Sequence, residues 1–551
     1  MDFPLSVILY GTLILTACLG LIACLSPLLT LAYLWQLKEW RWDRLTEHLK
    51  REGWFKQLFG VIRPGIFMAE LTGIFLIVIF HGYIDSMPMA GADDNIHFPA
   101  SLGVLMIFLL CCSFLVIGLS IIQILSKKQR YPTWTTKAKA IVGAGLVLNF
   151  FMTLGSGIFL LPFLVLLQPF VITFSWLLFY PVDQFLKKRI LNKAKILRAH
   201  YNLKAIGITG SVGKTTTKEL IAHILSGQNP LVTPAHVNTE MGVAQWLMKV
   251  LPRTQDSKLK TQLLITEMGA YRKGEIKNLC DIVQPSIGVI TYIGTQHLAL
   301  FGSQAKLIEA KGELLQALPE DGHAFINADC EPCATMDRFA GCPVTKVGTT
   351  AKADLQAHSV QETPDGIRFA VGDEQFEVPI HGTHNVNNVL LAMGVGKECG
   401  MSNDEIKKKL ATFQAPAKTF QVREENGIRL LDDTHNASEA SFTAAIDWAK
   451  HQPEQTKILL TSGIIELGAD EMNIHEELGR MAKDVFSEAI FTHPILARHF
   501  EKGFGKPVSV ASKKTGCLPP GSLLVCIGRM SHQTMTRILP KSSDLPLPTT
   551  D

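Results

Sequence analysis

The sequence lacks the features expected of a nucleic-acid-binding protein. Its formal net charge at pH 7 is only +4, and no Lys/Arg block contains interleaved aromatic residues. A disulfide framework is not expected either, because the cysteine count of 11 is odd and four cysteines lie in apolar runs, at Cys18, Cys24, Cys111 and Cys112. Free buried thiols and a reducing compartment around the soluble part are predicted. The first four residues contain no Lys or Arg, which argues against a cleavable signal peptide.

Charged residues are scarce in the first third of the chain, where five apolar segments suggest membrane spans of about 20 residues each. They run over Leu5–Leu34, Ile66–Ile84, Ala100–Leu125, Ala140–Leu154 and Ile158–Tyr180. The fourth segment is short and is separated from the fifth by Gly155-Ser156-Gly157, so the pair could form a transmembrane or a re-entrant hairpin. A transmembrane helical region of about five spans is therefore predicted over residues 1–190.

Basic residues indicate the orientation of these spans, because loops rich in Lys and Arg stay in the cytoplasm. Lys38–Arg63, Lys127–Lys137 and Lys187–Arg198 are rich in both, whereas Asp85–Pro99 contains neither. The pattern predicts an N-terminus outside the cell and a cytoplasmic chain after the fifth span.

Two interpretations of the membrane region stay open. It could be an anchor alone, but one helix would suffice for that, so five spans could also form a surface that binds lipid or a partner. The aromatic residues of the first basic loop fit an amphipathic segment at headgroup level equally well, at Trp40, Trp42 and Trp54.

The soluble part begins with the pattern of a strand, a glycine loop and a helix. Lys204–Thr209 is typical of a buried strand and Lys214–Leu225 of a helix, with TGSVGKT between them. In this context backbone N–H groups and the helix N-terminus bind phosphate oxygens. Lys214 is expected to reach the β- and γ-phosphates of ATP, and Thr215 to bind Mg²⁺. The predicted nucleotide-binding residues of the loop are Thr209, Gly210, Ser211, Val212, Gly213, Lys214, Thr215 and Thr216.

This loop and the stretches that follow it resemble, in order, the motifs of the Mur ligase family, and most closely its D-alanyl-D-alanine-adding branch. The further stretches are Asn238–Gly242, Leu264–Ala270, Ile290–Leu298, Glu309–Glu313, Asn327–Asp329, Gly382–Asn388 and Asp432–Ala437. The resemblance covers about Ala194 to Leu539. It implies a P-loop central domain followed by a Rossmann-like α/β domain.

The resemblance also implies an ATP-dependent ligase that joins a carboxylate to an amine through an acyl phosphate. The resemblance assigns catalytic roles to Lys214, Glu267, His297 and Lys311. It also implies that Lys311 carries a carbamate. Metal ligands are expected at Thr215, Glu267, His297 and Lys311. Asn327 is expected to contact the adenine, and Asp433 is expected to contact the ribose. Two further residues are expected to lie close to the nucleotide, His384 and Asn388. The acceptor is expected at Asn238, Thr239, His435 and Asn436.

Taken alone, these residues carry plainer alternatives. Glu267 ends an apolar run, and a carboxylate at the end of a parallel strand faces the ligand crevice of an open α/β sheet, although it could be merely a solvated strand end. A lone His297 could be structural, and Lys311 could be a solvent-facing helix residue. Two asparagines could equally cap a helix that starts near Val386, namely Asn385 and Asn387.

Four positions depart from the family pattern. Ile208 replaces the glycine of the strict phosphate-loop pattern, and Tyr292 stands where asparagine is usual. Lys418-Thr419 replaces Gly-Arg, so a point charge would stand where a bidentate guanidinium faces the phosphates. Ile527-Gly528-Arg529 replaces a common Lys-Gly-Ser. ATP binding is still expected, whereas the usual acceptor and full activity are left open.

The pair Cys330-x-x-Cys333, with Cys342 nearby, could suggest a structural zinc site. Such a site usually needs four ligands, and no second C-x-x-C follows. Incidental cysteines are therefore the preferred interpretation.

The fold is predicted as an α-helical transmembrane bundle followed by α/β domains. Strand and helix patterns alternate over residues 195–417, which predicts a largely parallel sheet with helices on both faces. A second α/β series over 418–540 has strands expected near Ile428–Asp432, Lys457–Thr461, Ala489–Thr492 and Ser522–Ile527. ATP is expected between these two domains. Residues 541–551 are rich in Pro, Ser and Thr and are expected to be disordered.

The membrane region occupies the place of the family's soluble N-terminal domain, which holds a UDP-sugar. The acceptor is therefore expected to be a cell-envelope precursor, possibly lipid-linked, to which an amino acid or short peptide is added. The expected location is the plasma membrane of a bacterium, with cytoplasmic catalytic domains. Alternatives are a poly-γ-glutamate or folate-type ligase, a non-catalytic nucleotide-binding scaffold and, least favoured, a P-loop transporter.

Overall fold

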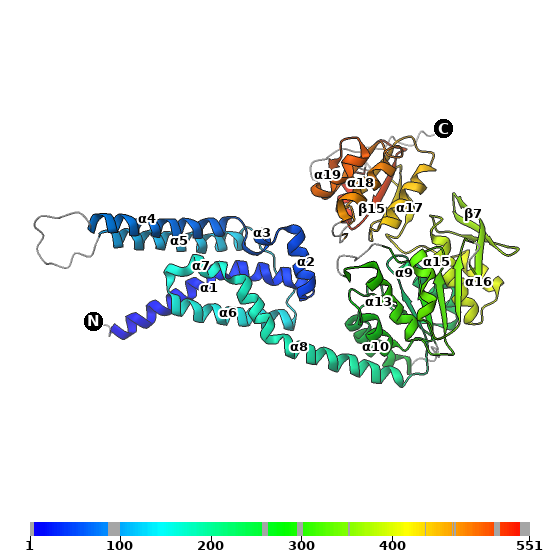
Figure 1. Ribbon diagram of the computed structural model, residues 1–551, viewed down its shortest axis with the longest axis horizontal. Helices are drawn as coiled ribbons and strands as arrows, with labels where there is room; N and C mark the ends of the chain where they lie inside the picture. Colours follow the sequence, from blue (N-terminus) through cyan, green and yellow to red (C-terminus); the bar gives the residue numbers. More distant parts are fainter. Residues whose placement is uncertain are drawn as a thin grey trace, which may run out of the picture. The chain divides into compact units, whose positions relative to one another are not determined.

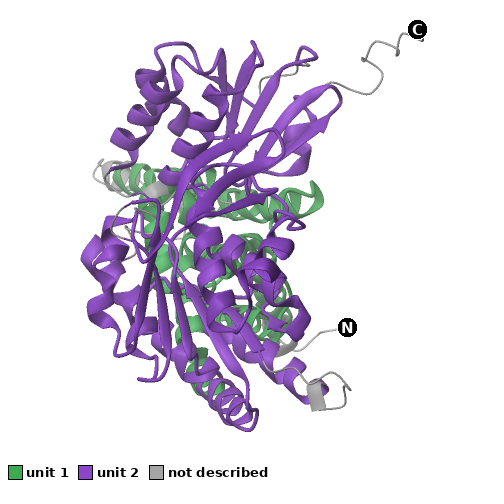
Figure 2. Cartoon of the chain, turned by 90° about the vertical axis from the view of Figure 1, so that its right-hand side faces the viewer, with its two compact units in different colours: residues 1–186 green, residues 187–551 purple. Residues whose placement is uncertain are grey.

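A computed structural model describes residues 5–85, 100–255, 263–294, 301–350, 353–435, 437–464, 467, 470–511 and 518–539. The predicted tail over 541–551 lies outside the described residues. The chain forms two compact units, Met1–Leu186 (unit 1) and Lys187–Asp551 (unit 2), shown in Figure 2. Helix α8 (Gln168–Ala199) contributes residues to both.

The regular elements in the described part of unit 1 are all helices. Among the described residues, five helices are long and apolar enough to cross a membrane by length and composition, which equals the predicted number. The elements before α8 are α1 (Leu5–Leu37), α2 (Trp42–Glu52), α3 (Trp54–Phe59), α4 (Ile62–Asp85), α5 (Ala100–Leu125), α6 (Thr136–Ser156), η1 (Ile158–Leu160) and α7 (Leu161–Leu166).

The start of the fifth apolar segment differs from the prediction. A span beginning at Ile158 is wrong, because η1 and α7 occupy its first part and the long helix α8 begins only at Gln168. Gly157 has a positive φ of 72° after α6, and proline follows closely at the start of both α7 and α8. Proline lacks the N–H of a helix interior but suits a first turn, so the apolar run divides into two helices.

Polar side chains tie these helices together. Asn149 of α6 and Gln168 of α8 are both buried and exchange hydrogen bonds of 3.1 and 2.7 Å between their amides. Helix α1 packs against α5 and α6, while α4 lies along α5 (Figure 1). Paired amides inside an apolar bundle satisfy each other, which removes the cost of burying them singly.

The first part of unit 2 contains a nine-stranded sheet in the order β2-β3-β1-β4-β5-β6-β7-β8-β9. The strands from β2 to β7 pair in parallel, and β7, β8 and β9 pair antiparallel. Their bounds are β1 (Lys204–Thr209), β2 (Leu231–Val232), β3 (Leu263–Glu267), β4 (Ile287–Ile290), β5 (His323–Asn327), β6 (Val344–Gly348), β7 (Leu355–Thr363), β8 (Gly366–Val371) and β9 (Glu374–Val378).

Helices cover both faces of this sheet, as predicted, and each face has its own apolar core. One face carries α9 (Lys214–Ile224), η2 (Leu225–Gln228), α15 (Asn385–Glu398) and α16 (Asn403–Leu410). The other carries the end of α8 together with α10 (Glu240–Gln255), α11 (Glu275–Val283), α13 (Gln304–Gln316), α14 (Glu331–Ala334) and η3 (Met336–Phe339).

The second part of unit 2 is a six-stranded sheet in the order β10-β11-β15-β12-β13-β14, parallel except for β10. Its strands are β10 (Gln421–Glu425), β11 (Ile428–Asp433), β12 (Lys457–Thr461), β13 (Glu488–Phe491), β14 (Ser509–Val510) and β15 (Leu523–Ile527). Its helices are α17 (Glu439–Lys450), α18 (Glu471–Ala482), α19 (Pro494–Phe504) and α20 (His532–Thr536). The α/β fold class is therefore confirmed, while the antiparallel strands β7 to β10 were not anticipated.

The helices α18 and α19 pack so closely that two glycines face the backbone of the opposite helix. A Cβ at Gly503 would collide with the carbonyl oxygen of Glu476, and a Cβ at Gly479 with that of Phe500. We therefore expect Gly503→Ala to lower the free energy of unfolding of this region by about 1–3 kcal/mol, because the backbones must separate. Faster amide hydrogen exchange in β13 and β15 would report the loss.

The matched control is Gly227→Ala, since a Cβ there meets no atom within 4 Å. Unchanged exchange in the Gly503→Ala variant would show that the two helices can move apart freely.

Candidate active site

The glycine loop after β1 leads directly into α9. Gly210 and Gly213 have positive φ angles of 152° and 84°, and a Cβ at either would collide with a neighbour, Thr291 or Asn388. These two glycines therefore let the loop close tightly over the ends of the strands. The Lys214 Nζ donates hydrogen bonds to the carbonyl oxygens of Gly210 and Ser211, at 2.8 and 2.9 Å. The lysine thus folds back over the loop, on the side where phosphate would bind.

A buried carboxylate lies beside this loop at the end of the neighbouring strand. Glu267 accepts hydrogen bonds from the Thr215 hydroxyl, at 2.9 Å, and from the Asn238 amide, at 3.0 Å. Burial would raise its pKa, but the charge of Lys214 and the two hydrogen bonds outweigh burial and hold the pKa below its usual value. Glu267 is therefore ionised at neutral pH. The structure brings together four of the predicted residues from three segments.

The donor set fits Mg²⁺, which binds proteins through one or two carboxylates and completes its shell with phosphate and water oxygens. Thr215 and Glu267 supply a hydroxyl and a carboxylate within 2.9 Å of each other. Among the residues that the structure describes, no group of three or more His, Cys, Asp or Glu could hold a metal. The predicted ligand His297 lies outside the described residues.

Lys311 is buried in α13 rather than facing solvent, with 3% of its surface exposed. Burial, together with the charge of Lys214, lowers its pKa to about 7, against the opposing charges of Glu275, Glu267 and Glu313. An amine with such a pKa is largely neutral at slightly alkaline pH. The solvent-facing alternative considered from the sequence is thereby excluded.

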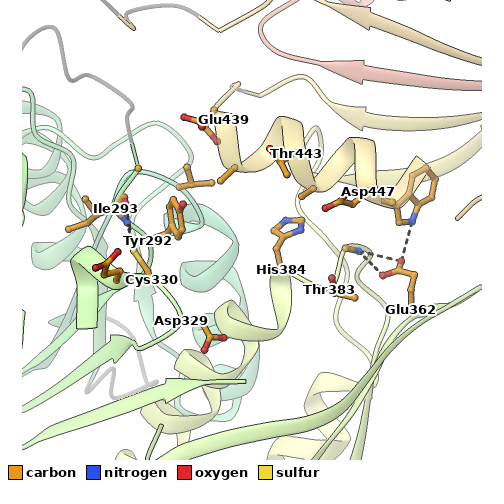
Figure 3. A pocket seen from close by; sticks show the side chains of 18 of the residues that line it. Tyr292, Ile293, Asp329, Cys330, Glu362, Thr383, His384, Glu439, Thr443 and Asp447 are labelled. Atoms are coloured by element: carbon orange, nitrogen blue, oxygen red, sulfur yellow. Dashed lines mark hydrogen bonds between the residues drawn. The ribbon is translucent and has the colours of Figure 1, made fainter. Parts of the chain in front are cut away.

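A cavity of about 1090 Å³ lies between the two sheets of unit 2 (Figure 3). Its wall from the first sheet contains Tyr292, Ile293, Asp329, Cys330, Glu362 and His384. Its wall from α17 contains Glu439, Thr443, Asp447 and Trp448. Val212 of the glycine loop also borders the cavity, which therefore reaches this loop. A volume of this size suits a nucleotide-sized ligand.

His384 is the predicted residue that faces this cavity most directly (Figure 3). The His384 side chain is exposed to the cavity, but the protein atoms that enclose the cavity desolvate its imidazole and lower its pKa, to about 4, so it is neutral at physiological pH. Its ring packs edge-on against Phe420, with ring centroids 4.8 Å apart. A neutral imidazole can hydrogen-bond a ligand without adding charge.

Asp433, at the end of β11, is a buried acid with one unused oxygen. Its Oδ1 accepts a hydrogen bond from the Phe420 N–H at 3.2 Å, whereas its Oδ2 has no hydrogen-bond partner among the described residues. Burial raises its pKa to about 7, and the charge of Asp432 adds to that effect. Such an unsatisfied buried oxygen is costly unless a ligand group bonds to it.

Several other predicted residues support the loop or helices instead of lining the cavity. Thr209 donates to the Met268 carbonyl, and Asn388 accepts from Thr217 behind Gly213. Asn327 accepts the Asp329 N–H, and Thr239 accepts the Gly242 N–H at the start of α10. These contacts hold the loop and the helix ends in place, and Asp329, the partner of Asn327, lines the cavity.

The His435 ring stacks on the ring of His236, which belongs to the domain of the first sheet. Their ring centroids are 5.0 Å apart and the interplanar angle is 3°. Burial and the neighbouring His236 lower the pKa of His435. The predicted neighbour Asn436 lies outside the described residues. Lys418, at the position of the family's arginine, is exposed with a φ of 64°, and Arg529 is also exposed.

One link between the two sheets was missed from the sequence. Glu362 of β7 accepts hydrogen bonds from Trp448 Nε1 at 3.1 Å and from the Gly382 N–H at 3.0 Å, and it contacts His381 Nδ1 at 2.8 Å (Figure 3). Only the fold brings these residues together, so no local pattern could have identified them. Tyr292, in contrast, was noted from the sequence because asparagine is usual at its position in the family. The structure places it in the wall of the cavity.

The cysteine pair forms no metal centre among the described residues. Cys330 and Cys333 are free and buried, and a hydrogen bond with Cys333 lowers the pKa of Cys330 to about 7. The Ile293 N–H donates to Cys330 Sγ at 3.4 Å.

Comparisons with known proteins match this arrangement. Residues 208–396 match the family model for the Mur ligase middle domain. UDP-N-acetylmuramoyl-tripeptide–D-alanyl-D-alanine ligase of Mycobacterium bovis is 35% identical over 294 residues, which are 51% of this chain and 56% of the relative. The Bacillus subtilis protein of that name is 30% identical over 322 residues, which are 56% of this chain and 68% of the relative.

Among solved structures, MurF from Acinetobacter baumannii superimposes with a TM-score of 0.58 and 25% identity, over 64% of this chain and 81% of that one. These matches confirm the resemblance inferred from the motifs. The chain spans only a little over half the length of the mycobacterial relative.

The buried Asp433 predicts a pH-dependent change in stability. Because its pKa rises from 3.8 to about 7 on folding, the folded state favours the neutral acid, and stability falls as the pH rises from about 4 to 7. We expect Asp433→Asn to remove this penalty, at most about 4 kcal/mol, and so to stabilise unit 2 at pH 8.

Well below pH 3.8 the substitution should have little effect, because aspartic acid is then neutral in both states. Urea unfolding at the two pH values measures the difference. Equal effects at both would show that folding does not raise the pKa of Asp433.

Proposed function

Since the chain belongs to the Mur ligase family, we propose that it is an ATP-dependent ligase that joins a carboxylate to an amine during synthesis of a cell-envelope precursor. The observation that carries this proposal is the ionised Glu267, hydrogen-bonded to Thr215 and Asn238 under the glycine loop. Phosphate binding alone would need only the loop and Lys214. A carboxylate shared by the loop helix and the predicted acceptor segment also supports a reaction between the γ-phosphate and an acceptor.

The proposed reaction has two steps. An acceptor carboxylate attacks the γ-phosphorus of ATP, which forms an acyl phosphate and releases ADP. An amine then attacks the acyl carbon, phosphate leaves with the bonding electrons, and the ammonium formed loses a proton to give the amide. Thr215 and Glu267 would hold Mg²⁺, which would offset the negative charge of the phosphates.

The protein's own groups position the reactants and offset charge. Lys214 would leave the loop carbonyls and turn to the β- and γ-phosphates. Neutral His384 and the free Oδ2 of Asp433 offer hydrogen-bonding groups for the nucleoside in the cavity between the sheets. Because residues from both sheets contribute, closing one domain onto the other would complete the site.

The environment of Lys311 supports the carbamylation that the family resemblance implies for this residue. Only a neutral amine adds to CO₂, and a pKa of about 7 leaves much of Lys311 neutral at cytoplasmic pH. Carbamylation would replace the positive charge of protonated Lys311 near Lys214 with a negative charge. The two side chains would then attract each other instead of repelling each other.

The acceptor is proposed to be membrane-bound, for example lipid-linked. Helix α8 continues from the apolar region to Ala199 and β1 begins at Lys204, so no soluble domain intervenes between them. The five apolar helices would hold the chain in the plasma membrane, with unit 2 in the cytoplasm. An amino acid or a short peptide would be the amine.

The first test is ADP release from ATP by the full chain in the presence of acceptor and amine. We expect Lys214→Ala to lower the rate by at least about 100-fold, because it removes charge stabilisation of the transferred phosphate. The exposed Lys277→Ala serves as the matched control for loss of a lysine.

Matched acceptors, one lipid-linked in nanodiscs and one soluble and UDP-linked, should give faster turnover with the lipid-linked form. Equal turnover of both would refute the membrane-bound acceptor. No turnover by the wild-type chain with any acceptor would favour a nucleotide-binding scaffold.

A carbamate on Lys311 is expected to appear as a carbonyl signal in ¹³C NMR after incubation with ¹³C-bicarbonate at pH 8. The signal should weaken at pH 6, where the amine is protonated, and vanish in Lys311→Arg. Lys218 provides an internal control, because it is equally buried but ion-paired with Glu219 at 3.0 Å. A signal that persists in Lys311→Arg would assign the carbamate elsewhere.

A further inference from the structure

An arginine in unit 1 is surrounded by neutral hydrogen-bonding groups from several segments. Arg63 lies in the first turn of α4, and its Nη2 donates to Gln123 Oε1 of α5 at 2.9 Å and to Ser26 Oγ of α1 at 3.3 Å. Ser26 Oγ in turn donates to Gln129 Oε1 at 2.8 Å. Ser26 and Gln129 are buried, so the network is built into the packing of the helices.

The guanidinium has no carboxylate partner among the residues that the structure describes. Other partly buried cations of unit 1 do have one, in the pairs Arg41–Asp43, Arg44–Glu39 and Lys137–Asp183. The acid nearest along α4 is Glu70, which lies two helical turns away, or about 10 Å along the axis. That separation is too large for an ion pair.

This arrangement leaves a positive charge partly removed from water and not neutralised. Arg63 is half-buried, and its Nε is fully buried with no hydrogen-bond partner in the part of the chain that the structure describes. Burying such a charge costs free energy that neutral amides and hydroxyls offset only in part. A bound anion would offset the rest, and the planar guanidinium suits phosphate oxygens in particular.

The residues before Arg63 place it at the level of lipid headgroups. Helix α3 has no buried residue, and its three aromatic rings contact one another, with centroids 5.3–6.3 Å apart. Exposed apolar side chains continue up to the start of α4, at Trp54, Phe55, Val61 and Ile62. Such an aromatic segment partitions into the membrane interface, where lipid phosphates lie.

We propose that Arg63, together with Gln123 and Ser26, binds the phosphate group of an anionic membrane lipid. The acyl chains would lie along the exposed apolar faces of α4 and α5, which include Phe75, Leu76, Ile107, Phe114 and Ile122. The proposal rests on the membrane location in the proposed function but not on the ligase chemistry. The apolar surroundings favour a lipid headgroup over free phosphate.

The test uses the full chain in neutral detergent, titrated with fluorescently labelled phosphatidic acid and with labelled diacylglycerol, which lacks the phosphate. We expect saturable binding of phosphatidic acid that is at least about ten-fold tighter than binding of diacylglycerol. Arg63→Gln should weaken phosphatidic acid binding by about ten-fold, since it removes a charged hydrogen-bond donor. Arg63→Lys keeps the charge and should retain part of the affinity.

Lys56→Gln is the matched control, because it removes the same charge from the neighbouring aromatic segment, at an exposed position. It should change affinity by less than about two-fold if binding is specific to Arg63. Equal loss in both variants, or unchanged affinity in Arg63→Gln, would overturn the proposal. Equal binding of the two lipids by the wild-type chain would overturn it without relying on any variant.

Inorganic phosphate separates the two sources of the anion. Displacement of the lipid by phosphate at a concentration equal to that of the lipid would assign the site to free phosphate and overturn the lipid proposal. Lys214→Ala should bind phosphatidic acid like the wild type while releasing no ADP. Lipid binding without turnover would therefore count against the ligase alone, and turnover without lipid binding against the Arg63 site alone.

Discussion

The Glu267 carboxylate has only 4% of its surface exposed, and the surrounding segments hold it in its charged form. Burial would favour the neutral acid, but Lys214, Thr215 and Asn238 reverse that preference. These partners come from the start of α9 and from the segment before α10, so one charge fixes three separate segments at the ends of the strands. Removing a hydrogen-bond partner from a buried charged group costs about 1–3 kcal/mol or more, so the positions of these segments depend on one another.

Burial acts in the opposite direction on three other groups of unit 2. It brings the pKa values of Lys311 and Asp433 to about 7, so that both groups are only partly charged near pH 7, and desolvation keeps His384 neutral well below that pH. The region therefore combines one firmly ionised carboxylate with neighbours whose charge depends on what binds beside them. Such separation of pKa values within one region is typical of functional sites, where charge must change during reaction or binding.

Unit 1 also buries polar groups, here among apolar helices. Most of its polar contacts are mutually satisfied, as in the amide pair of Asn149 and Gln168. Arg63 differs because its partners are neutral and its charge has no counter-ion among the described residues. In the proposed function, the membrane presents the acceptor, and a phosphate-binding arginine at headgroup level gives that membrane a chemically specific contact with the chain.

The sequence by itself determined the number of apolar helices, the strand–loop–helix around Gly213 and the α/β class, because hydrophobic periodicity and glycine spacing are local properties. It did not determine where the fifth apolar run divides, or the antiparallel strands β7 to β9. The pairing of Glu362 with Trp448 and the unsatisfied oxygen of Asp433 were likewise decided only by the tertiary structure. Burial and hydrogen bonding between residues far apart in the chain set these features and the pKa of Lys311, and no local pattern encodes them.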